Sequence, residues 1–152
     1  MIGKLTNLAD IYYYIFAGKA IFTLVSPKTG RRYTYKVTED ILADGQKTYK
    51  IHLLQGDDNT KDYHFIARLY YNKAQIWWQK HKCFTTDIDE VSVTEGYSYA
   101  ESAINCILQY PEFYIMKGGE FWHSGRCAKC GRLLTTPKSV ATGIGPHCRR
   151  KQ

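Results

Sequence analysis

The chain begins with a helical pattern of apolar residues. Within residues 6–17 they recur every three or four positions, the spacing that places side chains on one face of an α-helix. Thr6 or Asn7 can cap this helix, and Gly18 can end it. The pattern therefore predicts a helix with one face against a core. The apolar stripe consists of Leu8, Ile11, Tyr12 and Ile15.

A period of two follows, which is typical of β-strands. Pro27 and Gly30 mark a tight turn between the first two predicted strands, and short polar segments separate the others. Four strands joined by short turns indicate an antiparallel meander with one buried face. The predicted strands cover residues 20–26, 31–37, 47–54 and 63–71.

Alternation along these strands predicts which side chains share a face. In the fourth strand it assigns Tyr63, Phe65, Ala67, Leu69 and Tyr71 to the buried face. The opposite face of the sheet would be basic, and Trp77 and Trp78 follow nearby. Tyrosines at period two are typical of a core, and lysines opposite them are typical of wet surface, so we interpret this face as solvated. Its basic residues are Lys36, Lys50, His52, His64 and Arg68.

A second helix is predicted over residues 98–109. Ser98 and Glu101 form a capping box at its start, and its inner stripe places Cys106 and Tyr110 in the core. Pro111 should stop this helix, and the following residues suggest a hairpin at Gly118–Gly119. The fold class we expect is α+β: an antiparallel meander with two helices and a small C-terminal zinc knuckle.

Composition and charge divide the chain in two. Of its 152 residues, 44% are apolar and 23% charged, which is ordinary for a globular protein. The formal net charge is +7, of which residues 120–152 carry +6, with seven basic side chains against Glu120. We therefore expect an α+β domain over residues 1–119 and a basic zinc-binding module over 120–152. Such a patch suits a polyanion; the alternative is a solvated tail.

The sequence predicts neither a membrane span nor a secretory signal. No stretch approaches the roughly 20 apolar residues that cross a bilayer. The N-terminus lacks a small-residue cleavage site. We therefore expect a cytoplasmic protein with no membrane partner.

Three of the five cysteines, Cys127, Cys130 and Cys148, fall within the last 26 residues. The C-x2-C spacing is half of a zinc site, and Cys148 supplies a third ligand. The fourth could be His123 or His147. Neighbouring residues rarely point at one metal, so we favour His123. Cys83 remains an outside candidate, and Cys106 looks like a core residue.

A redox role for the C-x2-C pair is the weaker alternative. The pair lacks the βαβ setting of thioredoxin-like motifs, and Gly131 would weaken a helix after it. The spacer before Cys148 predicts a short helix over 138–142, with Thr135 or Thr136 as cap and Gly143 as stop, and a returning strand. Because this module is too small to bury a large hydrophobic core, a metal would supply much of its folding free energy.

The stretch FWHSGRCAKCGRLLTTPKSVATGIGPHC resembles the C-terminal motif of an uncharacterised family found often in bacteriophages and prophages. The shared pattern is W-H-x-G-R-C-x-x-C-G-R-x-L-T-x-P-x-S-x-x-x-G-x-G-P-x-C. Two earlier stretches, AGKAIFTLVSPKTGRRYTYKV and GDDNTKDYHFIARL, are similar to its start and middle. The resemblance implies a viral setting in the host cytoplasm and a histidine ligand at position 123. It implies no particular reaction.

We expect no enzymatic activity, because no P-loop, GxSxG or HExxH motif occurs. The favoured function is binding of nucleic acid, or of a nucleic-acid-bound complex, by the basic module. One alternative is a protein-binding inhibitor of a host nucleic-acid-processing enzyme or defence system, comparable to an anti-CRISPR factor. A metal-dependent enzyme using Asp57–Asp58 or the Asp87–Glu90 cluster is the least favoured. The expected phosphate contacts are Arg126, Lys129, Arg132, Lys138, Arg149 and Arg150.

Overall fold

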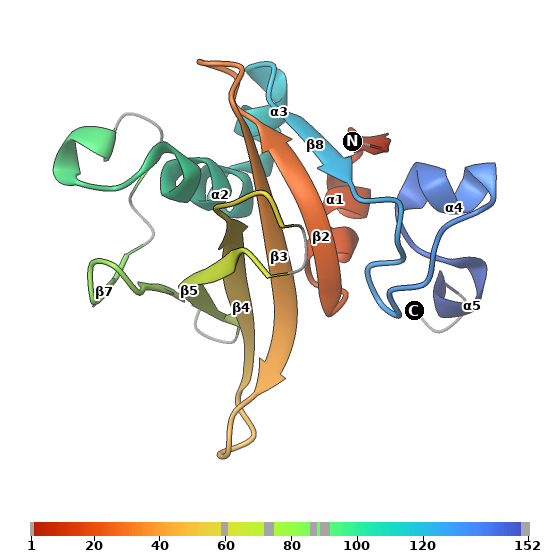
Figure 1. Cartoon of the computed structure of the whole chain (residues 1–152), viewed down its shortest axis with the longest axis horizontal. Coiled ribbons are helices and arrows are strands. Elements are labelled where there is room, and N and C mark those ends of the chain that lie inside the picture. Colours follow the sequence, from red (N-terminus) through yellow and green to blue (C-terminus); the bar gives the residue numbers. More distant parts are fainter. Residues whose placement is uncertain (1, 59–60, 72–74, 86–87, 89–91, 150–152) are drawn as a thin grey trace.

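The computed structural model describes residues 2–58, 61–71, 75–85, 88 and 92–149. It is an α+β structure built on one antiparallel sheet (Figure 1). None of the helices in these ranges combines the length and apolar character needed to cross a membrane.

The sheet has eight strands in the order β1-β8-β2-β3-β4-β5-β6-β7. Its centre is the predicted meander β2 to β5, which is confirmed with boundaries close to those expected from the sequence. Strands from both ends of the described chain extend it, because β8 pairs with β1 on one side and β2 on the other. The strands are β1 (Gly3–Leu5), β2 (Lys19–Val25), β3 (Arg32–Ile41), β4 (Lys47–Leu54), β5 (Tyr63–Tyr70), β6 (Gln75–Trp78), β7 (Cys83–Phe84) and β8 (Glu120–His123).

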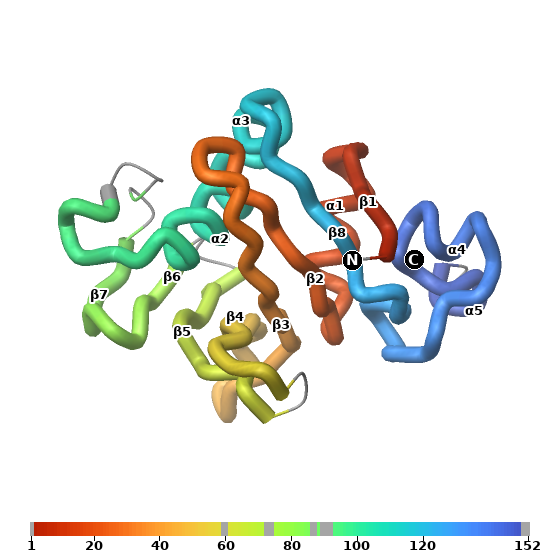
Figure 2. Tube along the Cα trace, turned by 45° about the horizontal axis from the view of Figure 1, so that its top comes forward, coloured from red at the N-terminus to blue at the C-terminus, as the bar shows by residue number. Residues whose placement is uncertain are grey.

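The helices α1, α2 and α3 lie together against one face of the sheet, and α4 and α5 lie beside its β1–β8 edge (Figures 1 and 2). Tyrosine hydroxyls tie the sheet to the first group: Tyr35 donates to the Ala100 carbonyl over 2.6 Å, and Tyr49 to that of Phe16 over 3.2 Å. The helices are α1 (Leu8–Ile15), the 3₁₀ turn η2 (Ser92–Glu95), α2 (Tyr99–Gln109), α3 (Pro111–Met116), α4 (Pro137–Thr142) and α5 (Pro146–Arg149).

The two predicted helices are confirmed by their caps. The Asn7 side chain accepts from the Asp10 amide at the start of α1, and Ser98 and Glu101 form the reciprocal capping box of α2. Cys106 is buried as predicted, whereas Tyr110 is 52% exposed because it ends α2 instead of extending its inner stripe.

The predicted hairpin at Gly118–Gly119 is wrong. Pro111 ends α2 and begins α3, since proline lacks an amide hydrogen and its fixed φ suits the first helical position. The chain then enters β8, which lies between β1 and β2 in the sheet. Residues 120–123, the start of the segment that we expected to form a separate module, therefore belong to the sheet.

A β-bulge in β5 changes the predicted faces. Ile51 pairs with Ala67 but the next residue, His52, pairs with Phe65, so Ile66 is an extra residue. Because the side-chain period is two, one extra residue moves everything before it to the other face. Ala67 and Leu69 are buried as predicted, but Phe65 and Tyr63 lie on the face opposite the helices, which the sequence pattern did not predict.

Two hydrophobic clusters form among the buried residues. The larger one joins the inner face of the sheet to α1, α2 and α3, and the smaller one consists of Cys127, Leu134, Ile144 and Cys148 with Val140 against it. The small cluster is too limited to stabilise a fold by burial alone, and two of its four members are cysteines.

Candidate metal centre and basic surface

The sulfur atoms of Cys127, Cys130 and Cys148 converge, all within 4.8 Å of one another. Zn–S bonds of about 2.3 Å in a tetrahedron place sulfurs roughly 3.8 Å apart. The three side chains can therefore hold a metal ion after small adjustments. The structure thus brings together three cysteines that the sequence grouped, although Cys148 comes 18 positions after Cys130.

The C-x2-C turn is a tight, hydrogen-bonded loop. The Cys127 amide donates to the Arg132 carbonyl and the Gly131 amide donates to the Cys127 carbonyl, both over 2.8 Å. Gly131 has φ of 80°, a left-handed conformation that a residue with a Cβ adopts only at a cost. A single bridge between Arg126 and Leu133 closes the turn.

The segment that returns to the cysteines consists of two short helices. The Thr136 hydroxyl accepts from the Ser139 amide at the start of α4, and Gly143 ends it with φ of 78°, as predicted. A Cβ on Gly143 would lie 2.4 Å from the Tyr14 ring, so glycine also permits close packing on α1. Cys148 arrives on helix α5 and not on the expected returning strand.

The environment of the cysteines acts unequally on their thiols. Burial raises the pKa of Cys127, but hydrogen bonds from the amides of Gly145 and Cys130 outweigh it and lower that pKa to about 7. Burial and hydrogen bonding with the other two cysteines raise the pKa of Cys148 to about 11. Backbone amides aimed at a sulfur favour its thiolate form, the form that binds metals.

His123 does not join the cysteine cluster, contrary to our expectation. It is fully buried in β8; its Nδ1 accepts from the Gly125 amide over 3.0 Å and its Nε2 donates to the Val140 carbonyl over 2.5 Å. Its ring stacks on Tyr14 at 5.6 Å. Both nitrogens are thus used to join the sheet to α4, and burial lowers the pKa of the imidazole, which keeps it neutral.

A pocket of about 440 Å³ opens beside the three cysteines. His147 lines it together with Lys129 and Arg132. His147 is exposed on α5 but lies outside the group of converging ligand atoms. The described residues therefore offer three sulfur atoms to a metal ion, and all three cysteines line this pocket.

The predicted phosphate-contacting residues differ in whether their side chains are exposed or already hydrogen-bonded within the protein. Arg126, Lys129, Arg132 and Lys138 are exposed, with Arg126 also donating to the Gly131 carbonyl over 3.3 Å. The Arg149 guanidinium instead donates to the carbonyls of Lys138 and Ile144 and to the Thr142 hydroxyl, so it closes α4 inside the module. Arg150 lies outside the described residues.

The remaining candidates lie away from the metal centre. Cys83 hydrogen-bonds with the Tyr97 hydroxyl over 3.4 Å. Asp58 belongs to a polar turn, where the Asp62 carboxylate accepts from its amide over 2.7 Å. The acidic cluster Asp87, Asp89 and Glu90 lies outside the residues that the structure describes.

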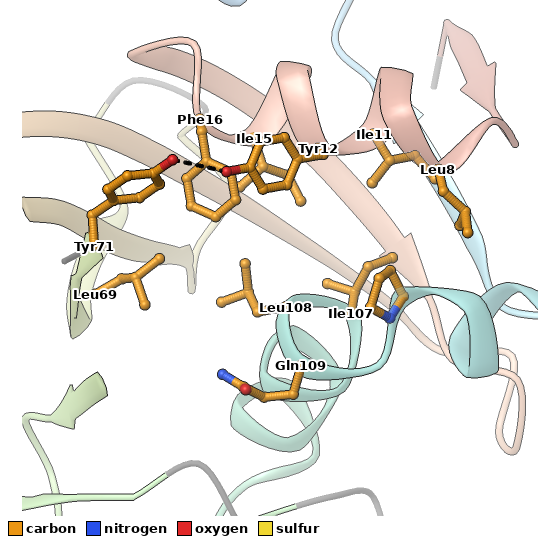
Figure 3. A pocket seen from close by; sticks show the side chains of 11 residues that line it. Leu8, Ile11, Tyr12, Ile15, Phe16, Leu69, Tyr71, Ile107, Leu108 and Gln109 are labelled. Atoms are coloured by element: carbon orange, nitrogen blue, oxygen red, sulfur yellow. Dashed lines mark hydrogen bonds between the residues drawn. The ribbon is translucent and has the colours of Figure 1, made fainter. Parts of the chain in front are cut away.

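A second pocket, of about 200 Å³, separates α1 from α2. Figure 3 shows its apolar lining, with the hydroxyls of Tyr12 and Tyr71 hydrogen-bonded to each other at 3.0 Å. That hydrogen bond, with burial, raises the pKa of Tyr12 to about 12. The residues that line this pocket include no charged side chain.

Comparison with known proteins is informative for the C-terminal segment. Residues 120–152 match a family of unknown function (DUF6011), which covers β8 and all three clustered cysteines. The match supports the resemblance to an uncharacterised family over about a fifth of the chain. No curated protein matches the chain, and no solved structure does.

Proposed function

We propose that this chain is a small, non-enzymatic phage protein that binds nucleic acid through a zinc-stabilised basic C-terminal module. The observation that carries the proposal is the convergence of three cysteine sulfurs within a segment that holds seven basic residues and one acidic residue. Sulfur donors favour Zn²⁺ over hard cations such as Mg²⁺.

The role of the metal in this proposal is structural. When bound, Zn²⁺ would join the C-x2-C turn to α5 and so fix the surface between them. Lys129 and Arg132 line the pocket at this junction, and Lys138 projects from α4. These side chains contact phosphates, while the cysteines only hold the module in shape. Arg149 acts within the module and makes no phosphate contact in this proposal.

Nucleic-acid binding is tested by fluorescence anisotropy with labelled random-sequence oligonucleotides, single- and double-stranded, at about 50 and 200 mM salt. The double variant Lys129→Gln/Arg132→Gln removes two exposed charges from the module. We expect its affinity to fall at least about tenfold and the slope of log K against log salt to drop by roughly 1.4 to 1.8. The reason is that the variant makes fewer phosphate contacts, so its binding releases fewer counterions from the nucleic acid.

The matched control is Lys28→Gln/Lys117→Gln, which removes the same charge from exposed positions on the β2–β3 turn and after α3. It should bind almost as tightly as the wild type. Equal losses of oligonucleotide affinity in both variants would show that binding depends on the net charge of the chain and not on the basic module. Failure of the wild-type chain to bind any oligonucleotide at low salt would contradict the proposal and favour a protein partner.

A further inference from the structure

Three neighbouring rows of side chains run across the strands on the face of the sheet opposite α1, α2 and α3. The pairing register defines them, because directly paired residues point to the same side. We call this surface the open face. Its rows are Lys4–Trp122–Thr23–Thr34 together with the pair Leu54–Tyr63, which lines the same hollow as Thr34, then Ile21–Lys36–His52–Phe65 and Lys19–Thr38–Lys50–Arg68–Trp77–Phe84.

Aromatic rings on the open face are paired with cations. The Lys36 ammonium lies 4.7 Å from the centre of the Tyr63 ring, and that of Lys4 lies 5.9 Å from Trp122. The Arg68 guanidinium lies 6.0 Å from Phe65. The bulge in β5 creates two of these three pairs, since without it Tyr63 and Phe65 would point into the core.

The charges of the open face are mainly positive. Its rows contain four lysines and one arginine, Lys4, Lys19, Lys36, Lys50 and Arg68. Two carboxylates flank them, and both are paired. Asp40 lies 2.7 Å from Arg68 and 3.9 Å from Lys50, and Glu120 lies 3.5 Å from Lys4. The surface is therefore complementary to a polyanion.

A hollow connects the open face with the metal module. It has a volume of about 490 Å³ and lies over the first row, where Thr34, Leu54 and Tyr63 line it. Arg126, one residue before the first cysteine of the module, lines the same hollow. An extended chain could thus pass from the basic module onto the sheet without leaving positive surface.

We propose that single-stranded nucleic acid lies across the open face, with bases stacked on Tyr63, Trp122 and Trp77. This inference rests on the proposed function and names its substrate class. Single strands expose the flat sides of their bases, which stack on aromatic rings, while lysines beside the rings meet the phosphates. A duplex hides those base surfaces and offers nothing for half-buried rings to stack on.

The dimensions suit a short oligonucleotide. Trp122 in β8 and Trp77 in β6 are five strand spacings apart, or about 24 Å at roughly 4.8 Å a strand. Stacking surfaces of this kind bind about 4–16 nucleotides. A strand that runs from Trp122 over the hollow to Trp77 would cross all three rows.

Tryptophan fluorescence of the full chain tests where the bases lie. The chain has three tryptophans. Trp77 and Trp122 point to the open face, while Trp78 is fully buried on the inner face and serves as an internal reference. Stacking of an unlabelled random-sequence single strand should quench the emission. The variant Trp77→Phe/Trp122→Phe should retain the buried Trp78 emission and lose the quenching.

Four outcomes overturn this inference. If anisotropy reports binding without quenching, or if quenching persists in the double variant, the bases lie elsewhere and the proposed function survives. Tighter binding of a duplex than of the single strand would also exclude stacking on the open face. Absence of all binding would contradict both proposals.

A substitution on the first row gives an independent readout. Tyr63→Leu keeps an apolar side chain but removes the ring, and we expect about a tenfold loss of single-strand affinity. Tyr13→Leu is the matched control, because Tyr13 is 54% exposed on α1, which packs on the other side of the sheet. Equal affinities of these two variants, both with wild-type circular dichroism, would overturn the inference.

Discussion

At the scale of single residues, His123 has a structural role in the core instead of the metal-binding role that the sequence suggested. Its position four residues before Cys127 suggested a fourth ligand, but the sequence does not reveal that β8 carries it into the core. There, Gly125 and Val140 use both ring nitrogens. The three cysteines could be predicted from their spacing, whereas this histidine could not, because its role depends on tertiary contacts.

The variant His123→Ala tests this assignment. We expect the free energy of unfolding to fall by about 2–4 kcal/mol, because two buried hydrogen bonds and the packing on Tyr14 are lost. Chemical denaturation measures the change, and His147→Ala, at an exposed position, should have little effect. The folded His123→Ala chain should still carry one metal ion. Loss of the metal from folded protein would restore His123 as a ligand.

At the scale of elements, the sequence pattern was sufficient for the meander but not for the faces of β5. Alternation and turn residues located β2 to β5 closely, because period and turn chemistry are local properties. The bulge at Ile66 depends on how β5 pairs with β4, and no feature of the strand itself marked it. The sequence pattern therefore assigned Phe65 and Tyr63 to the core, although both contribute to the open face.

The ion pair between β3 and β5 leads to a prediction for binding. Its Arg68 hydrogen bond lowers the pKa of Asp40, so the carboxylate stays charged at neutral pH and holds Arg68 and Lys50. The stability from this pair is present above the unfolded pKa near 3.9 and is lost as the pH falls through the lower folded pKa. Asp40→Asn frees both cations and should increase single-strand affinity about two- to fivefold at neutral pH.

Anisotropy titrations at fixed salt measure this gain. Asp44→Asn is a control of equal charge change, since Asp44 lies in the exposed β3–β4 turn, where its side chain accepts from the Gln46 amide. An unchanged or weaker affinity in Asp40→Asn would argue against nucleic acid on the open face.

At the scale of the whole molecule, the chain combines a large core with a small one that depends on its cysteines. The large core joins the sheet to three helices, while the small core has four buried members. The change in charge at residue 120, where we expected the basic module to begin, coincides with the start of β8, which belongs to the sheet. The charge pattern describes the composition of the surface, whereas strand pairing determines which residues join the sheet.

The most direct test of the account is a cobalt titration of the reduced full-length chain, because Co²⁺ replaces Zn²⁺ in sulfur sites and is visible by absorption. We predict saturation at one equivalent, with a thiolate-to-metal charge-transfer band that Zn²⁺ abolishes by displacement. Cys83→Ser should leave the titration unchanged. Cys148→Ser should weaken cobalt binding by well over roughly 100-fold, the upper loss when a residue that only hydrogen-bonds to a metal ligand is replaced. A chain without a charge-transfer band, or a Cys148→Ser variant with the wild-type titration, would contradict the metal centre.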